Sequence, residues 1–93
     1  MKNHRTFKLQ PVDGLKTLNN HHVNMYEVDG VTYSDLISYE TRVAYYNHDT
    51  KEMSVNGYYS RTTARHINSF LDYYGFDTCT KSQIEKYNQK DDF

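Results

Sequence analysis

The sequence predicts an α+β fold, with a small antiparallel sheet of three to four strands, one main helix packed on one face and a short C-terminal helix. Two observations support this prediction. Segments rich in β-branched and aromatic residues, several with period-2 alternation, precede residue 60, which is the pattern of strands. Apolar residues then recur at helical spacing between residues 64 and 74. This apolar stripe must be buried, and a sheet face is the available surface, so a two-layer arrangement follows.

The chain is long enough for one domain, which we expect to span residues 1–93 around a thin core. We expect residues 1–20 and 89–93 to be loosely ordered. No apolar run approaches the ~20 residues of a membrane span, and no apolar stretch follows the basic N-terminus as it would in a signal peptide. The single cysteine, Cys79, cannot form an internal disulfide. A cytoplasmic protein is therefore expected.

The first two strands are bounded by turn residues. A short edge strand is expected over Thr6–Gln10, because Pro11 ends the pattern. A second strand is expected over His21–Val28. The pair Asp29–Gly30 follows it between two valines, and such a pair is a strong signal for a tight hairpin turn.

The next strand is predicted to run without a break over Ile37–Asn47, which is dense in β-branched and aromatic residues. A polar connection over His48–Lys51 leads to a further strand over Glu52–Tyr59. The odd-numbered side chains of these strands are expected to face the helix, namely Tyr39, Val43, Tyr45, Met53 and Val55. Among the ten tyrosines we expect Tyr39, Tyr45 and Tyr74 to lie largely inside, and Tyr46, Tyr58 and Tyr73 to be more exposed.

Two helices are predicted near the C-terminus. The main helix is expected over Arg61–Tyr74, because Ser60 can cap its first turn and a glycine follows its last residue. A shorter helix is expected over Lys81–Asn88, started by a capping box of Thr80 and Gln83.

The formal net charge of −1 conceals a segregation of charge along the chain. Residues 1–18 are net +3, residues 19–40 are net −4 and residues 41–70 are net +2. Such blocks can form opposed faces that steer a charged partner, or they can be neutralised by ion pairs between neighbouring elements. Both alternatives stay open at this point.

No pattern for catalysis or metal binding is evident. The five histidines lack the spacing of metal ligands, and Cys79 has no base beside it in sequence. The four glycines fall at turn positions and form no phosphate-binding loop. We therefore expect no enzyme, no metal and no cofactor.

The stretch from Tyr58 to His66 is the strongest candidate site. A helix start offers free amides to an anion, and Ser60, Thr62 and Thr63 would line it. In the alternative interpretation these residues only cap the helix, and the arginines pair with the acidic segment. The predicted partner-binding residues are Tyr58, Tyr59, Arg61, Arg65 and His66, with the acidic Glu27, Asp29 and Asp35 as a second group.

Three segments carry a resemblance to known proteins, namely Ser38–Ala44, Val55–Ser60 and Thr62–Ile67 followed by Phe70. Together they span about residues 36–76 and resemble a family of small uncharacterised proteins common in phages and other mobile elements of bacteria. The resemblance implies a phage or prophage accessory protein. Inhibitors of host defence, anti-CRISPR proteins among them, are similar in size and in lacking recognisable catalytic sites.

The expected function is therefore that of a non-enzymatic accessory protein that binds and inhibits a host protein or ribonucleoprotein, such as a CRISPR-Cas effector. Two alternatives stay open: a nucleic-acid-binding accessory protein, and a binder of a small phosphate-bearing ligand at Ser60–Thr63. No membrane partner is expected. Whether the chain is a monomer or a homodimer is left undecided by the sequence.

Overall fold

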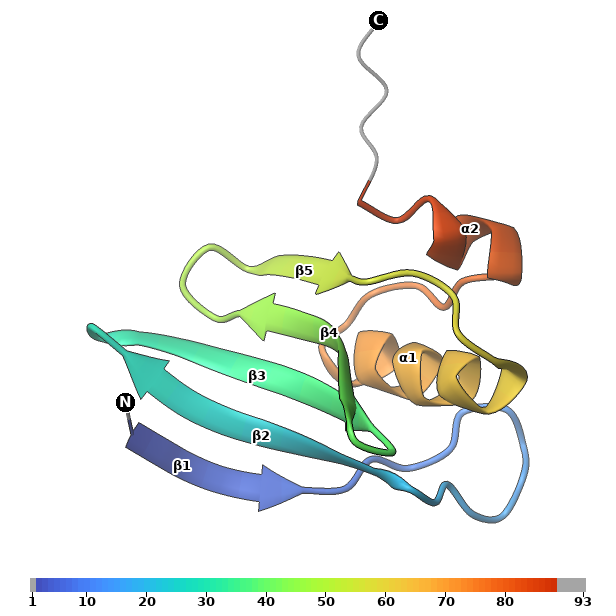
Figure 1. The fold of residues 1–93 in the computed structure, drawn as a ribbon, viewed down its shortest axis with the longest axis horizontal. Coiled ribbons are helices and arrows are strands. Elements are labelled where there is room, and N and C mark those ends of the chain that lie inside the picture. The colour runs from blue at the N-terminus through green and yellow to red at the C-terminus, as the bar shows by residue number, and fades with distance from the viewer. Residues whose placement is uncertain (1, 89–93) are drawn as a thin grey trace, which may run out of the picture.

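The computed structural model describes residues 2–88, and it shows an α+β fold with a five-stranded antiparallel sheet in the order β1-β2-β3-β4-β5. The predicted fold class is confirmed, with one strand more than expected. Helix α1 lies across one face of the sheet, while no helix within residues 2–88 covers the other face (Figure 1). The elements are β1 Lys2–Phe7, β2 His21–Val28, β3 Val31–Ser38, β4 Thr41–Asn47, β5 Glu52–Val55, α1 Arg61–Tyr73 and α2 Lys81–Glu85.

The hairpin between β2 and β3 forms as predicted. Its two turn residues, Asp29 and Gly30, have φ values of 52° and 82°, which is the left-handed conformation that a two-residue hairpin turn requires. The strand pairing is regular from Val28↔Val31 to His21↔Ser38.

The expectation of one continuous strand over Ile37–Asn47 is wrong. The chain reverses at Tyr39–Glu40, so that residues up to Ser38 belong to β3 and residues from Thr41 to β4. Tyr39 adopts a φ of 58°, and its backbone N–H donates to the carbonyl of Asn20 at 2.7 Å. A contact from a distant loop thus holds a turn for which the local residues give no signal.

An irregularity in the β3–β4 pairing changes which side chains face the helix. The partners shift between Ile37↔Arg42 and Leu36↔Ala44, which leaves Val43 as an extra residue in β4. Even-numbered residues from Ala44 onward therefore point toward α1. Tyr46 is buried with 8% exposure and Tyr39 is 53% exposed, so both predictions were wrong for these tyrosines.

The other side chains whose burial was predicted agree with the prediction in part. Val43 and Val55 are buried, and Met53 packs against the core, as expected. Tyr45 is half-buried on the helix-free face, contrary to the prediction. Tyr74 packs against the core and Tyr73 is exposed, as predicted, whereas Tyr58 also packs against the core.

The core lies between the sheet and α1. Leu9 and Leu18 are buried in it, so part of the segment between β1 and β2, for which we expected loose order, packs against the core. The first strand also lies earlier than predicted, and residues 89–93 are outside the described part of the chain. The buried apolar residues are Leu9, Leu18, Val23, Leu36, Val43, Ala44, Tyr46, Val55, Ile67, Phe70, Leu71 and Ile84.

Both helices begin where the sequence predicts. The Ser60 hydroxyl accepts from the Thr63 N–H at 3.2 Å, and α1 ends one residue earlier than expected. The capping box of Thr80 and Gln83 is present, although α2 ends at Glu85. The strand predicted to reach residue 59 ends at Val55, because an extended connection leads from there into α1.

Candidate binding face of the sheet

The structure does not bring the predicted Tyr58–His66 site together on the surface. His66, which we expected to contact a partner, has 0% exposure and therefore lies inside the fold instead of on this surface. Its Nε2 donates to the carbonyl of Asn19 at 2.7 Å, and its Nδ1 accepts from the Ser38 hydroxyl at 2.8 Å. Thr63 is buried too, with its hydroxyl 2.8 Å from that of Ser38. These groups form a polar network inside the fold.

Of the two arginines predicted to share an outward face of α1, Arg61 and Arg65, only Arg61 is exposed. Arg65 forms an ion pair with Asp13 and donates to the carbonyl of Thr17 at 2.9 Å. The Arg65 side-chain hydrogen bond lowers the pKa of the Asp13 carboxyl. The alternative in which the arginines pair with the acidic segment 19–40 does not hold for Arg65, because its partner Asp13 lies before that segment.

Of the other residues predicted at the start of α1, Ser60 caps the helix, and the rest are exposed or half-buried. Ser60 and Tyr59 are exposed, while Tyr58 and Thr62 are half-buried. The Lys81 ammonium lies 5.0 Å from the centre of the Tyr58 ring. Because the Ser60 oxygen is occupied as a cap, little remains here of the anion site that the sequence suggested.

The acidic residues of the second predicted group lie elsewhere. Asp29 is exposed at the β2–β3 turn and Glu27 is half-buried near it, at the end of the sheet opposite to the start of α1 (Figure 1). Asp35 lies in the middle of β3, accepts from the Tyr26 hydroxyl at 3.0 Å, and has Arg42 at 3.9 Å. Burial raises the pKa of the Asp35 carboxyl. The two predicted groups do not form one surface.

A different set of residues meets on the helix-free face. The rings of Tyr26 and Tyr33, directly opposite each other on β2 and β3, stack with centroids 5.6 Å apart. The guanidinium of Arg42 lies 4.9 Å from the centre of the Tyr45 ring. These side chains are held by one another while α1 covers the other side, so this helix-free face is the candidate site. The tyrosines were visible in the sequence, but the place of Tyr45 on the same face as Tyr26 and Tyr33 was not, because it depends on the irregularity at Val43.

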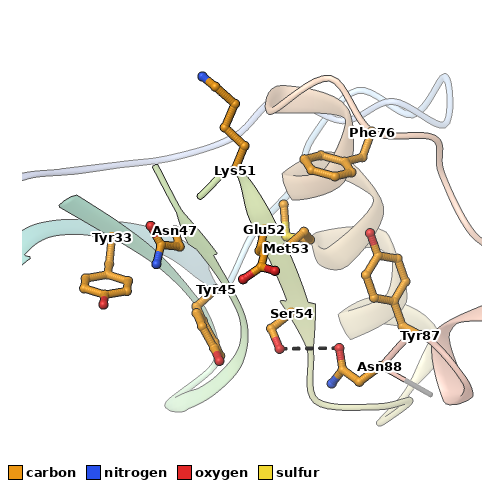
Figure 2. A pocket seen from close by; sticks show the side chains of 10 residues that line it. All are labelled: Tyr33, Tyr45, Asn47, Lys51, Glu52, Met53, Ser54, Phe76, Tyr87 and Asn88. Carbon is orange, nitrogen blue, oxygen red and sulfur yellow. Dashed lines mark hydrogen bonds between the residues drawn. The ribbon is translucent and has the colours of Figure 1, made fainter. Parts of the chain in front are cut away.

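A groove extends this face around strand β5. It has a volume of about 590 Å³ (Figure 2). One wall holds Tyr33, Tyr45 and Asn47, and the other holds Met53, Phe76 and Tyr87. Ser54 donates to the Asn88 side chain at 3.4 Å between them. Aromatic rings beside amide and hydroxyl groups can bind a partly apolar, partly hydrogen-bonding surface.

The titratable groups inside the fold offer no evident catalytic arrangement. His21 and His66 stack with ring centroids 4.9 Å apart, and burial lowers the pKa of both, that of His21 to about 4. Burial raises the pKa of the Cys79 thiol, which disfavours the nucleophilic thiolate. Within residues 2–88, no three His, Cys, Asp or Glu side chains group in a way that could hold a metal ion.

The fold and this face define a small two-layer α+β domain with one open, tyrosine-rich side. The chain belongs to a family of unknown function (DUF8033), whose model matches residues 7–86. No curated protein and no solved structure matches the chain. In the part of the chain that is described, neither helix has the length and apolar character needed to cross a membrane.

Proposed function

We propose that this chain is a non-enzymatic accessory protein that binds and inhibits a macromolecular partner, and that the helix-free face of the sheet is the contact surface. One observation carries the proposal. Tyr26, Tyr33 and Tyr45 share this face with Arg42, and α1 packs on the opposite side (Figure 1).

The chemistry of the face suits a protein partner. Tyrosine and arginine are enriched among the residues that contribute most to protein interfaces, since they bury a large area and end in polar groups. Here the contacts of Tyr26 with Tyr33 and of Arg42 with Tyr45 already restrict these side chains. Binding therefore costs less side-chain entropy than it would for mobile groups. The side chains of Asn47 and Asn88 in the groove are likewise held, by hydrogen bonds to the backbone of Asp49, Thr50 and Val55.

The resemblance to small proteins of phages and mobile elements supports a partner in the bacterial cytoplasm. A host defence complex, such as a CRISPR-Cas effector, is the form of partner that we propose. The test is phage plating on strains that carry such a system. Expression of the chain is expected to restore plaques, and unchanged plating across the strains would contradict this part of the proposal.

Nucleic acid and small phosphates rank behind a protein partner. Tyrosine rings can stack on bases, but binding to the backbone requires phosphate neutralisation. On the helix-free face the charge of Arg42 is opposed by Asp35. At the start of α1, Arg65 is paired with Asp13 and the Thr63 hydroxyl with Ser38.

Affinity capture from bacterial lysate, with and without nuclease, tests the assignment of the face. The double variant Tyr33→Thr, Tyr45→Thr introduces β-branched residues, which strands favour, and Tyr59→Thr is the control outside the face. We expect a nuclease-resistant partner that the double variant loses and the control retains. Capture that is equal for all three proteins would contradict the assignment, and capture abolished by nuclease would favour nucleic acid.

A further inference from the structure

The two outer edges of the sheet differ in how they are closed. At β5, the side-chain amide of Asn88 donates to the carbonyl of Val55 and accepts from its N–H, as a neighbouring strand would. At β1, no described element pairs with the outer side of the strand (Figure 1). A row of strand hydrogen-bonding groups is therefore available at β1.

The pairing of the sheet shows which groups of β1 point outward. The tight turn makes Val28 and Val31 a hydrogen-bonded pair, and alternation then directs the N–H and C=O of Asn24 toward β3. Thr6 is the partner of Asn24 in β1. The N–H and C=O of Thr6 consequently point away from the sheet, into the position of an added strand.

This edge is strongly basic. Lys2, Arg5 and Lys8 fall in the first 12 residues, which contain no Asp or Glu. Lysine on an edge strand is a common device against pairing of identical chains. A second copy would bring two edges of like charge together, which is destabilising, whereas an acidic strand would be attracted.

An aromatic shelf lies beside the edge on the helix-covered side. The Phe7 and Tyr73 rings are 5.2 Å apart, and Tyr73 is 51% exposed. Arg5 is exposed, with its guanidinium 4.4 Å from the centre of the Phe7 ring and 3.4 Å from the Tyr73 hydroxyl. Side chains of an added strand that point to this side would meet apolar rings and a cation together.

From these observations we infer that β1 is a docking edge for an extended, acidic segment of a partner protein, which adds to the sheet as a sixth strand. The hydrogen bonds to Thr6 set the register, and the shelf formed by Arg5, Phe7 and Tyr73 receives alternate side chains. Carboxylates of the segment face Arg5 on the helix-covered side, and the exposed Lys8 adds to the positive charge of the edge. This edge is separate from the helix-free face, so the two proposals stand or fall independently.

A capped peptide of alternating glutamate and valine is the probe, and its lysine–valine counterpart is the control. NMR titration should show the acidic peptide bound at β1, with slower hydrogen exchange of the Thr6 amide and affinity at least tenfold above the basic peptide. Affinity should fall as salt is raised, since the charges are exposed. Equal binding of both peptides, or shifts confined to other strands, would overturn the inference.

Two variants of one residue isolate the backbone contribution. Thr6→Pro removes the outward N–H and leaves the β1–β2 hydrogen bonds in place, and Thr6→Val removes only the hydroxyl that donates to Asn24. Thr6→Pro should abolish binding and Thr6→Val should retain it. Should Thr6→Pro melt early, Lys8→Glu serves instead, with an expected loss of at least fivefold and an unchanged melting temperature; undiminished binding would contradict the inference. Sedimentation is expected to show a monomer, and a dimer abolished by Thr6→Pro would identify a second copy as the occupant.

Discussion

The two faces of the sheet use the same residue type for different purposes. On the covered face, the Tyr46 ring stacks on Tyr74 of the α1 C-cap, with centroids 4.4 Å apart, and is buried. On the helix-free face, Tyr45, its neighbour in sequence, remains half-buried and lies beside Arg42. The difference teaches that a tyrosine-rich composition does not decide between core and interface. The direction of each side chain from the strand decides it.

The largest expected effect comes from adjacent residues of β3 that point to opposite faces. Leu36 is fully buried and Ile37 is half-buried. Leu36→Ala should lower the free energy of unfolding by about 3 kcal/mol, since it removes buried methyl groups and leaves a cavity. Ile37→Ala should cost about 1 kcal/mol or less because its side chain already contacts water. Urea denaturation measures both, and equal losses would contradict the assignment of faces.

The next largest effect is the pH dependence of stability that the stacked histidines His21 and His66 cause. Burial lowers the pKa of His21 from 6.5 to about 4 in the folded state, and burial lowers that of His66 too. The unfolded chain therefore binds protons more readily, and stability falls as the pH is lowered from about 6.5 to 4. The loss attributable to His21 is on the order of 3 kcal/mol.

The matched control for this pH effect is the adjacent histidine. His21→Gln should flatten the dependence of the urea midpoint on pH between 6.5 and 4. His22→Gln alters the neighbouring, half-buried residue, whose side chain points to the helix-free face, and should leave the dependence as it is. Identical pH profiles for the wild type and His21→Gln would show that the buried imidazole does not control acid stability.

Elements that depend on local chemistry were predictable from the sequence. The Asp29–Gly30 turn, the Ser60 cap and the Thr80 capping box each need residues only a few positions apart. The turn at Tyr39 was missed because the carbonyl that holds it belongs to Asn20.

The positions of the candidate site residues could not be predicted for the same physical reason. Arg65 was expected to be available on the surface, but its partner Asp13 lies 52 residues away. His66 was expected to contact a partner, but the segment containing Asn19 covers it. Long-range contacts of this kind leave no spacing pattern in the sequence, whereas helix caps and tight turns do.

Removing one hydroxyl on the covered face should produce a smaller loss of stability. The Tyr74 hydroxyl lies 2.6 Å from the hydroxyl of Ser34, which is fully buried and also 2.8 Å from Nε2 of His48. Tyr74→Phe should cost about 1 kcal/mol, because a buried polar group loses one of its partners. Thermal unfolding followed by circular dichroism measures it, and a stabilised variant would contradict the assigned network.

The same substitution on the helix-free face should have the smallest effect of all. The Tyr26 hydroxyl donates to Asp35, but that carboxyl also faces Arg42 and is reached by solvent. Tyr26→Phe should therefore change the free energy of unfolding by about 0.5 kcal/mol or less. If it cost as much as Tyr74→Phe, the polar groups of this face would be part of what holds the fold together. A small cost together with loss of the captured partner would mean instead that the sheet presents Tyr26 for binding, while its stability comes from the face that α1 covers.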